Sequence, residues 1–278
     1  MIVAKRGVIE KTAFLILALF FVVLFGFPFV ITFIMSFKSQ GDYMSGNYWG
    51  LPHKIFLGNV QKVLLSRFNR YFLNSVFVSG LAVTLTVFIS SLASYAFAKI
   101  KFRLSPIVFT LFIIGMMIPV HTTLIPIYQL TKAMHLTDRL LGLVAPYISM
   151  GLPVAIYVIT GFFREVPGSI QESAHIDGAS SLRIYWSIML PISVPAISTV
   201  AILNFLTYWN EFIYALTLIN TVTRRTVPLG IKEFYGLEMV NIPAVFAAIL
   251  IASLPVIIFY MFAQEKVING LSAGAVKG

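Results

Sequence analysis

The chain has 278 residues, of which 59% are hydrophobic and 11% charged, and its formal net charge is +10 at pH 7. A soluble domain of this length needs far more charge to cover its surface, so the composition excludes a soluble enzyme or binding protein. The absence of cysteine excludes a disulfide framework and thiol chemistry. The positive charge does not require a nucleic-acid partner, because anionic lipid headgroups attract the same basic residues.

Long apolar stretches recur along the chain and alternate with short polar connections. Each exceeds the roughly 20 residues that cross a hydrocarbon core about 30 Å thick. Since lipid cannot satisfy backbone N–H and C=O groups, these stretches are expected to be helices. The sequence therefore predicts an all-α polytopic membrane protein, with a single transmembrane domain over residues 1–278. Six transmembrane helices are expected, at approximately 12–37, 71–98, 104–131, 140–163, 191–220 and 241–264.

The basic residues indicate how the chain is oriented in the membrane. Those before the first span favour a cytoplasmic N-terminus. Counted over all connections, Lys and Arg divide evenly, with ten on each side. Because Lys99, Lys101 and Arg103 crowd one short connection, their density favours the same orientation, with both termini cytoplasmic. The first span is too long for the apolar core of a cleaved signal peptide and no small-x-small site follows it.

Two features predict departures from simple spans. Pro119 and Pro126 lie seven residues apart on one face of the third span, and each is expected to bend it by removing a helical hydrogen bond. The connection 38–70 is the largest hydrophilic segment and combines several glycines with aromatic residues. It is expected to be an ordered outer loop that contains short structure.

The connection 164–190 is rich in small and polar residues although it lies between two apolar spans. Ser169 followed by Glu172 matches a capping box, so a short helix is expected over 170–177. Gly178 can supply the left-handed turn that closes this helix.

A second short helix is expected after this turn, capped by Ser180 or Ser181 and continuing to Leu190. Ala174 and Gly178 keep one side of the resulting helix–turn–helix thin. Such a knuckle at the membrane surface suits insertion into a groove of a partner. On spacing alone, an amphipathic loop that covers the helix ends fits equally well.

The same connection reads Glu172-Ser173-Ala174-x-x-Asp177-Gly178-Ala179, and nine residues then separate Gly178 from Ile188-x-Leu190-Pro191. This pattern resembles the EAA loop of ABC importer permeases, although Ser173 stands where the family usually has Ala. Further matches extend over nearly the whole chain, at 70–75, 95–99, 117–119, 124–126, 208–212 and 270–278. The last two are similar to the second permease subunit of the maltose-type carbohydrate importers.

The resemblance implies the architecture of a type I ABC importer permease in a bacterial cytoplasmic (inner) membrane. It implies a heterodimer with a homologous second permease, two cytoplasmic ATPase subunits and an extracytoplasmic solute-binding protein that delivers a sugar. Carried over residue by residue, it makes Glu172, Ala174, Asp177 and Gly178 the residues that couple to the ATPase. The loop then faces the cytoplasm, as both termini do.

The fifth span carries polar residues at helical spacing. Asn204, Thr207, Tyr208 and Glu211 follow the pattern i, i+3, i+4, i+7 and are expected on one helix face. A polar face within lipid turns toward the protein interior or a water-filled path. We therefore take Asn204, Tyr208, Asn210 and Glu211 as candidate substrate-pathway residues, with Glu211 toward the outer end. The same groups can instead bond to neighbouring helices, which would make Glu211 a structural brace.

Motifs that indicate catalysis are missing. There is no phosphate-binding GxxxxGK[ST] sequence, no metal-ligand spacing among the four histidines and no nucleophile elbow. We therefore expect a non-enzymatic subunit without a cofactor or metal. Its cargo could also be another small polar solute, such as a glycerol phosphodiester. An ion-coupled transporter with Glu211 or His121 as its proton site is the alternative of a different class, but it leaves the coupling loop unexplained.

Overall fold

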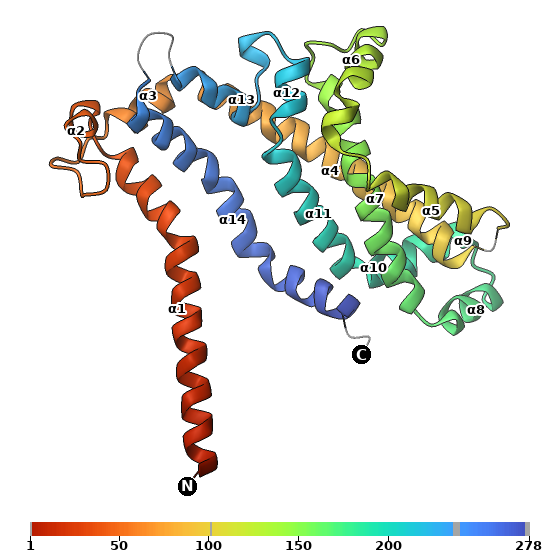
Figure 1. The fold of residues 1–278 in the computed structure, drawn as a ribbon. Coiled ribbons are helices and arrows are strands. Elements are labelled where there is room, and N and C mark those ends of the chain that lie inside the picture. Colours follow the sequence, from red (N-terminus) through yellow and green to blue (C-terminus); the bar gives the residue numbers. More distant parts are fainter. Residues whose placement is uncertain (1, 101, 236–239, 276–278) are drawn as a thin grey trace. The chain divides into compact units, whose positions relative to one another are not determined.

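The computed structural model describes residues 2–100, 102–235 and 240–275, with side chains for 11–100, 102–235 and 240–261. These residues form helices and connecting loops, and no β-strand occurs among them (Figure 1). The chain divides into two compact units, which are described separately. One comprises Met1–Phe68 with Ile231–Leu254, and the other Asn69–Gly230 with Pro255–Gly278.

The first unit is built on a long apolar helix, α1 (Ile2–Ser36), whose most apolar window contains no buried residue. The short structure expected over 38–70 is present as α2 (Gln40–Met44) and α3 (Gly58–Leu65). The unit also contains η4 (Lys232–Tyr235) and the first part of α14 (Ile242–Ala275).

A buried asparagine fixes the end of α1. The side-chain amide of Asn59 donates to the carbonyls of Ser36, at 3.0 Å, and Lys38, at 2.7 Å. These carbonyls belong to the end of α1 and the residues after it, which lack helical partners. The Asn59 side chain of α3 therefore holds the connection after α1 close to the end of that helix.

The second unit contains the remaining elements. They are α4 (Phe68–Lys99), α5 (Ser105–Gly115), η1 (Val120–Thr123), α6 (Leu124–Ala133), α7 (Leu141–Glu165), α8 (Gly168–Ile176), α9 (Ser181–Ile184), the π-helical turn η2 (Tyr185–Met189), α10 (Leu190–Ile192), α11 (Val194–Trp209), α12 (Ile213–Leu218), η3 (Val222–Arg224) and α13 (Val227–Ile231). α4 contacts α7 at the buried Ser94, whose hydroxyl donates to the Ile156 carbonyl at 3.1 Å.

The third span is bent, as Pro119 predicts, but the bend expected at Pro126 is absent and the span is not the continuous helix expected over 104–131. α5 ends at Gly115, and the chain resumes at Val120 with a bend of 98° between the two parts. Pro119 stands at the N-terminal boundary of η1, where its missing N–H ends the preceding ladder. Pro126 lies in the first turn of α6, where no N–H bond is required, and so does not interrupt that helix.

The fifth span also differs from the single helix expected over 191–220. The chain bends by 74° between the segment that ends at Ile192 and α11. α11 then ends at Trp209, and α12 begins only at Ile213. Residues 210–212 are therefore a non-helical break, so Glu211 does not belong to the helix that carries Asn204.

The number of membrane-crossing helices agrees with the expected class. Among the described residues, four helices are long and apolar enough to span a membrane, or six if each bent pair counts as one span. The all-α polytopic fold predicted from the sequence is confirmed.

Asp138 joins two connections at the end of α7 opposite to α8. Its carboxylate accepts the N–H groups of Asn220 and Thr221, at 3.0 and 2.8 Å, and pairs with Arg224 at 3.1 Å. Its own N–H donates to Leu218 at 2.8 Å. Burial raises the pKa of Asp138, but the hydrogen bonds from Thr221 and Asn220 and the charge of Arg224 outweigh it and hold the pKa below its ordinary value.

We expect Asp138→Asn to lower the free energy of unfolding by about 1 kcal/mol at neutral pH, because the amide cannot pair with Arg224. Because the pKa of Asp138 is lower in the folded state, its carboxylate stabilises the folded protein at pH values above the ordinary pKa of 3.8. This stabilisation is lost as the pH falls through the folded-state pKa. Thermal unfolding in detergent should thus separate the two proteins at neutral pH and not in strong acid. Glu165→Gln, at an exposed position, is the charge-matched control. A difference that persists unchanged in strong acid would contradict this role of the charge.

Candidate coupling loop and membrane pathway

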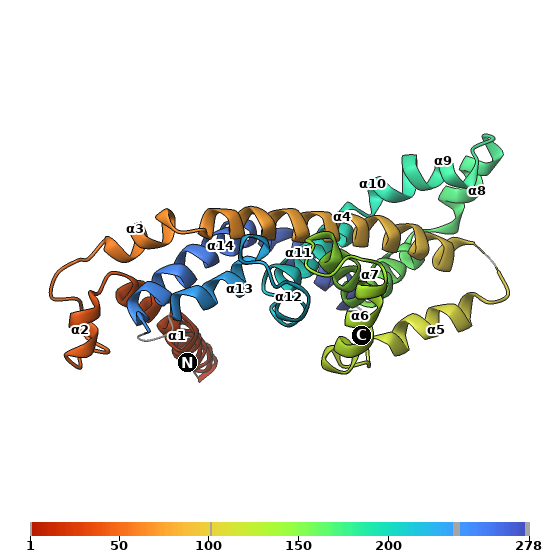
Figure 2. The same ribbon diagram turned by 90° about the horizontal axis from the view of Figure 1, so that it is seen from above.

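The connection between α7 and α11 folds as two short helices around a left-handed turn. α8 ends at Ile176, and Gly178 adopts φ +78°, which favours glycine. The N–H groups of Gly178 and Ala179 close the turn by donating to His175 and Ala174. Ser180 caps α9 by accepting the N–H of Arg183. Figure 2 shows these elements from above, with α8, α9 and α10 following one another.

The start of this loop differs from the expectation. α8 begins at Gly168, and the residue at its N-cap position is Pro167, with no side-chain cap. The capping box predicted at Ser169 and Glu172 is therefore wrong. A proline before the helix presets the extended backbone of an N-cap position, so the helix starts earlier than the serine signal suggests. The Glu172 carboxylate is thereby left on the exposed surface of α8.

Ala174 attaches the loop to the transmembrane helices. It is buried in a cluster with side chains from α4, α7, α9, η2 and α11. The other buried members are Tyr95, Ala155, Ile159, Phe163, Val166, Ile184, Tyr185, Met189 and Val200. Because closely packed interiors have low compressibility, a displacement of α8 is expected to move these helices as well.

Hydrogen bonds add a second attachment, to α4. The Tyr95 hydroxyl donates to the Ser181 carbonyl at 3.1 Å and accepts the Gln171 amide at 3.4 Å. The hydroxyls of Ser91 and Tyr185 lie 2.7 Å apart. Both halves of the loop are thus tied to the last turns of the same helix. Neither tyrosine was among the coupling residues predicted from the sequence, although a tyrosine near the end of an apolar helix often has a partner for its hydroxyl.

The outer face of the loop combines acidic and apolar groups. Glu172 and Asp177 are exposed. Ile176 is 86% exposed and Leu182 61% exposed. Large apolar side chains displayed between acids on a thin turn are typical of a surface that a partner covers. The two acids were predicted from the sequence, whereas the two apolar residues could not be, because an exposed apolar residue carries no signal in a chain this hydrophobic.

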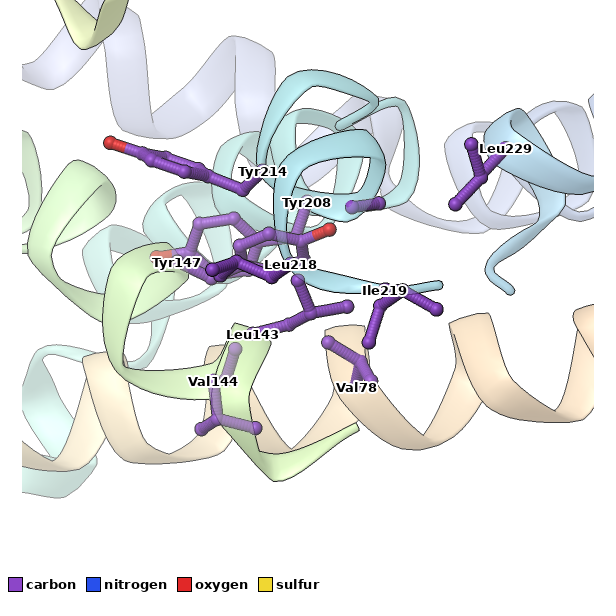
Figure 3. Close-up of a cluster of buried hydrophobic side chains, with 11 residues drawn as sticks. Val78, Leu143, Val144, Tyr147, Tyr208, Tyr214, Leu218, Ile219 and Leu229 are labelled. Carbon is purple, nitrogen blue, oxygen red and sulfur yellow. The ribbon is translucent and has the colours of Figure 1, made fainter. Parts of the chain in front are cut away.

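The candidate pathway residues separate into buried and exposed groups. Asn204 and Tyr208 of α11 are buried against Gly151 of α7, and the Tyr208 hydroxyl lies 2.9 Å from that of Thr86. The rings of Tyr208 and Tyr147 stack at 5.4 Å. Figure 3 shows these tyrosines within one cluster of buried side chains. Interhelical bonding therefore accounts for Tyr208.

Glu211 is 8% exposed and its carboxylate is enclosed by donors. It accepts the Tyr147 hydroxyl at 2.8 Å, the Tyr214 N–H at 2.7 Å and the Ala215 N–H at 3.2 Å. These two N–H groups belong to the first turn of α12, which has no helical acceptors for them. The negative charge also interacts favourably with the N-terminal end of the helix. Glu211 is thus a cap that bridges the break after α11.

The same turn of α12 reaches the break in the third span. The Tyr214 hydroxyl lies 2.7 Å from the hydroxyl of Thr123, at the end of η1. The two interrupted spans are therefore bonded to each other near their interruptions.

A small hollow lies between α7 and α11. Thr207 and Asn210 are exposed, whereas the other candidates are buried. A hollow of about 140 Å³ is lined by Asn204 and Thr207 together with apolar residues such as Met150 and Leu203. Within the described ranges, no group of three or more His, Asp or Glu side chains is placed to hold a metal ion.

Comparison with known proteins identifies the family. The model of the "binding-protein-dependent transport system inner membrane component" family matches residues 86–272. The chain belongs to this family. It is an inner-membrane permease component of an ABC transporter, and the family is one of transport subunits and not of enzymes.

Relatives and solved structures agree with this assignment. A putative ABC transporter permease of Caldicellulosiruptor sp. is 45% identical over 251 residues, covering 90% of this chain and 91% of that protein. The trehalose/maltose transport system permease protein of Thermococcus litoralis is 31% identical over 280 residues and 99% of each chain. A chain of the bacterial ABC transporter involved in the import of alginate has the same fold, with a TM-score of 0.81, 22% identity, and coverage of 94% of this permease and 96% of that chain.

If Glu211 is a structural cap, Glu211→Gln should destabilise the permease by about 1–3 kcal/mol, because one carboxylate oxygen is replaced by a donor that faces other donors. The neighbouring variant Asn210→Ala removes an exposed polar side chain and should change stability by less than about 0.5 kcal/mol. Thermal unfolding in detergent measures both. A Glu211→Gln protein as stable as the parent but inactive in transport would show a ligand role instead.

Close contact between α7 and α11 gives a separate prediction. A Cβ at residue 151 would lie 2.0 Å from both Asn204 Oδ1 and the Tyr208 hydroxyl. Gly151→Ala should therefore destabilise the permease by about 1–3 kcal/mol through overpacking. Gly161→Ala, on the same helix with nothing within 4 Å of its Cβ position, should be neutral or slightly stabilising. Equal unfolding temperatures for the two variants would contradict this packing.

Proposed function

We propose that this permease forms part of the membrane pathway of an ATP-driven importer of a sugar or oligosaccharide, and that its α8–α9 loop is driven by a cytoplasmic ATPase. The anchored loop carries the proposal: Ala174 is buried among the ends of the membrane helices while Ile176 projects from the turn. An element that is rigidly attached on one side and exposed on the other can transmit a displacement. The relatives named as trehalose/maltose and starch-degradation-product permeases support a saccharide cargo.

In this mechanism each coupling residue has a separate physical role. Gly178 sets the angle between α8 and α9 because its φ of +78° strains any other residue. Glu172 and Asp177 present acceptors to basic or hydroxyl groups of the ATPase. Ala174 keeps the loop close to the spans and passes the movement inward. ATP-driven closure of the two ATPase subunits would then move the attached helices between outward- and inward-facing arrangements.

The remaining partners follow from the family. A homologous second permease would complete a heterodimer. The exposed apolar surface of α1 is available to contact that subunit and the lipid. An extracytoplasmic solute-binding protein would deliver the cargo. The coupling loop must then face the cytoplasm. It follows the fourth span, so both termini would lie on that side, in agreement with the basic residues before the first span.

The cargo would pass along the α7–α11 face. Asn204 and Thr207 at the hollow offer amide and hydroxyl groups, which are the groups that recognise saccharides. Asn210 is exposed beside the break and belongs to the same path. Glu211 and Tyr208, which are both buried and hydrogen-bonded, would hold the wall of the path in place. An ion-coupled mechanism that uses Glu211 is disfavoured, because three donors hold this carboxylate.

The test is energy-dependent uptake. The permease is produced with its second permease, ATPase and binding protein and reconstituted in vesicles, and uptake of labelled maltodextrin or trehalose is followed with ATP. Uptake is expected only when all four proteins and ATP are present, and Gly178→Val should abolish it while leaving the permease in the membrane. The outer-loop variant Gly46→Val is the matched control.

The control is matched because Gly46 also has a positive φ, of +89°, and open space at its Cβ position. Both valines impose a similar backbone strain of about 1–2 kcal/mol. Loss of uptake in both variants would point to misfolding, and parental uptake with Gly178→Val would refute the coupling role of the turn. ATP-dependent uptake by the permease without the ATPase would refute the proposed function itself.

A further inference from the structure

A cavity of about 600 Å³ lies in the second unit, beside the turn that connects α4 to α5. Its walls come from the last residues of α4, the first residues of α5 and Gly168, the first residue of α8. The apolar helix α4 ends here and the apolar helix α5 begins here, so we expect the cavity at the level where a bilayer changes from acyl chains to headgroups. The pathway and the coupling face described above do not use it.

Two basic side chains line the cavity. Lys99 stands at the end of α4, where its ammonium also donates to the Val166 carbonyl at 2.6 Å, and Arg103 is exposed in the turn. Ser105 adds a hydroxyl, and no Asp or Glu is among the described residues of the lining. Such a site recognises an anion that accepts several hydrogen bonds, and a guanidinium binds phosphate with two parallel bonds.

The lining also contains aromatic side chains. Phe97 and Phe102 line the cavity with their rings 6.1 Å apart, and Phe97 also contacts Phe109 and Phe112 of α5 at 5.6 and 6.0 Å. This cluster fixes the turn between the helices and provides an apolar surface next to the basic groups. An inorganic anion would gain nothing from such a surface, whereas an amphipathic molecule would.

We propose that this cavity is a binding site for an anionic phospholipid. The headgroup phosphate would accept from Arg103, Lys99 and Ser105, and the first carbons of the acyl chains would lie on Phe97 and Phe102. The exposed apolar residues Leu104 and Ile107 beside the turn continue this surface toward the membrane. Because Gly168 borders the site, the bound lipid would contact the first residue of the coupling loop.

The site itself does not depend on the proposed function, since only the leaflet that it faces rests on the assigned orientation. Binding is therefore measured on the full-length permease without transport. Native mass spectrometry of the detergent-purified protein counts retained lipid during titration with phosphatidylglycerol or phosphatidylcholine, with and without inorganic phosphate. Phosphatidylglycerol should be retained preferentially, and inorganic phosphate should not displace it.

The variants separate the cavity from general attraction between charges. Arg103→Gln should weaken phosphatidylglycerol binding about fivefold, the contribution of one basic residue at a membrane surface. Arg103→Lys should restore most of it. Arg183→Gln removes the same charge from an exposed position in α9, outside the cavity, and should have no effect. Arg103 is exposed in a turn, so these substitutions should leave the fold intact.

Several results would overturn the assignment. Equal retention of the two lipids would show that the headgroup charge is not recognised, and equal losses in the Arg103→Gln and Arg183→Gln proteins would show diffuse attraction. Displacement by inorganic phosphate would assign the site to a free anion. If the lipid is released when the ATPase joins the complex, the cavity is a docking site for an acidic segment of that partner.

Discussion

Backbone N–H and C=O groups inside a bilayer have no water to bind, so any interruption of a membrane helix must be satisfied by the protein itself. The permease interrupts two spans and meets this requirement with side chains. The Glu211 carboxylate accepts the first N–H groups of α12, and the Tyr147 hydroxyl donates to the same carboxylate. Tyr214 then joins Thr123 near the other interruption. The two breaks are therefore linked by a hydrogen bond between side chains that lie beside them.

The coupling loop solves the opposite problem, because it must be attached to the membrane helices without being enclosed by them. A small side chain at Ala174 lets α8 approach the core, and the Tyr95 hydroxyl bonds both halves of the loop to α4. α4 also contacts α11 through Thr86 and Tyr208. A single helix thus connects the loop to the region of the breaks, and in the proposed function it provides a direct route for movement from the ATPase to the pathway.

Most of the fold and part of the site could be predicted from the sequence. The length of the apolar stretches alone predicts the membrane helices. Gly178 predicts the turn and Ser180 the second cap, because both features depend only on the residue itself and its immediate neighbours. The break at 210–212 could not be predicted, because no proline or glycine marks it and apolar residues resume directly after Glu211. Glu211 therefore seemed to extend the face that carries Asn204. At Glu172 the capping signal was overridden by Pro167, which starts the helix earlier.

These corrections change what the polar residues of the fifth span can do. A buried carboxylate that binds three donors has little capacity left for a ligand, and losing it would expose N–H groups that nothing else satisfies. In the proposed importer, discrimination among cargoes must then come from other groups than this carboxylate. In this segment Asn204 and Thr207 line the hollow between α7 and α11, and Thr207 and Asn210 are exposed. In the proposed importer, the residues that hold the wall and those that face the cargo are therefore different residues of the same short segment.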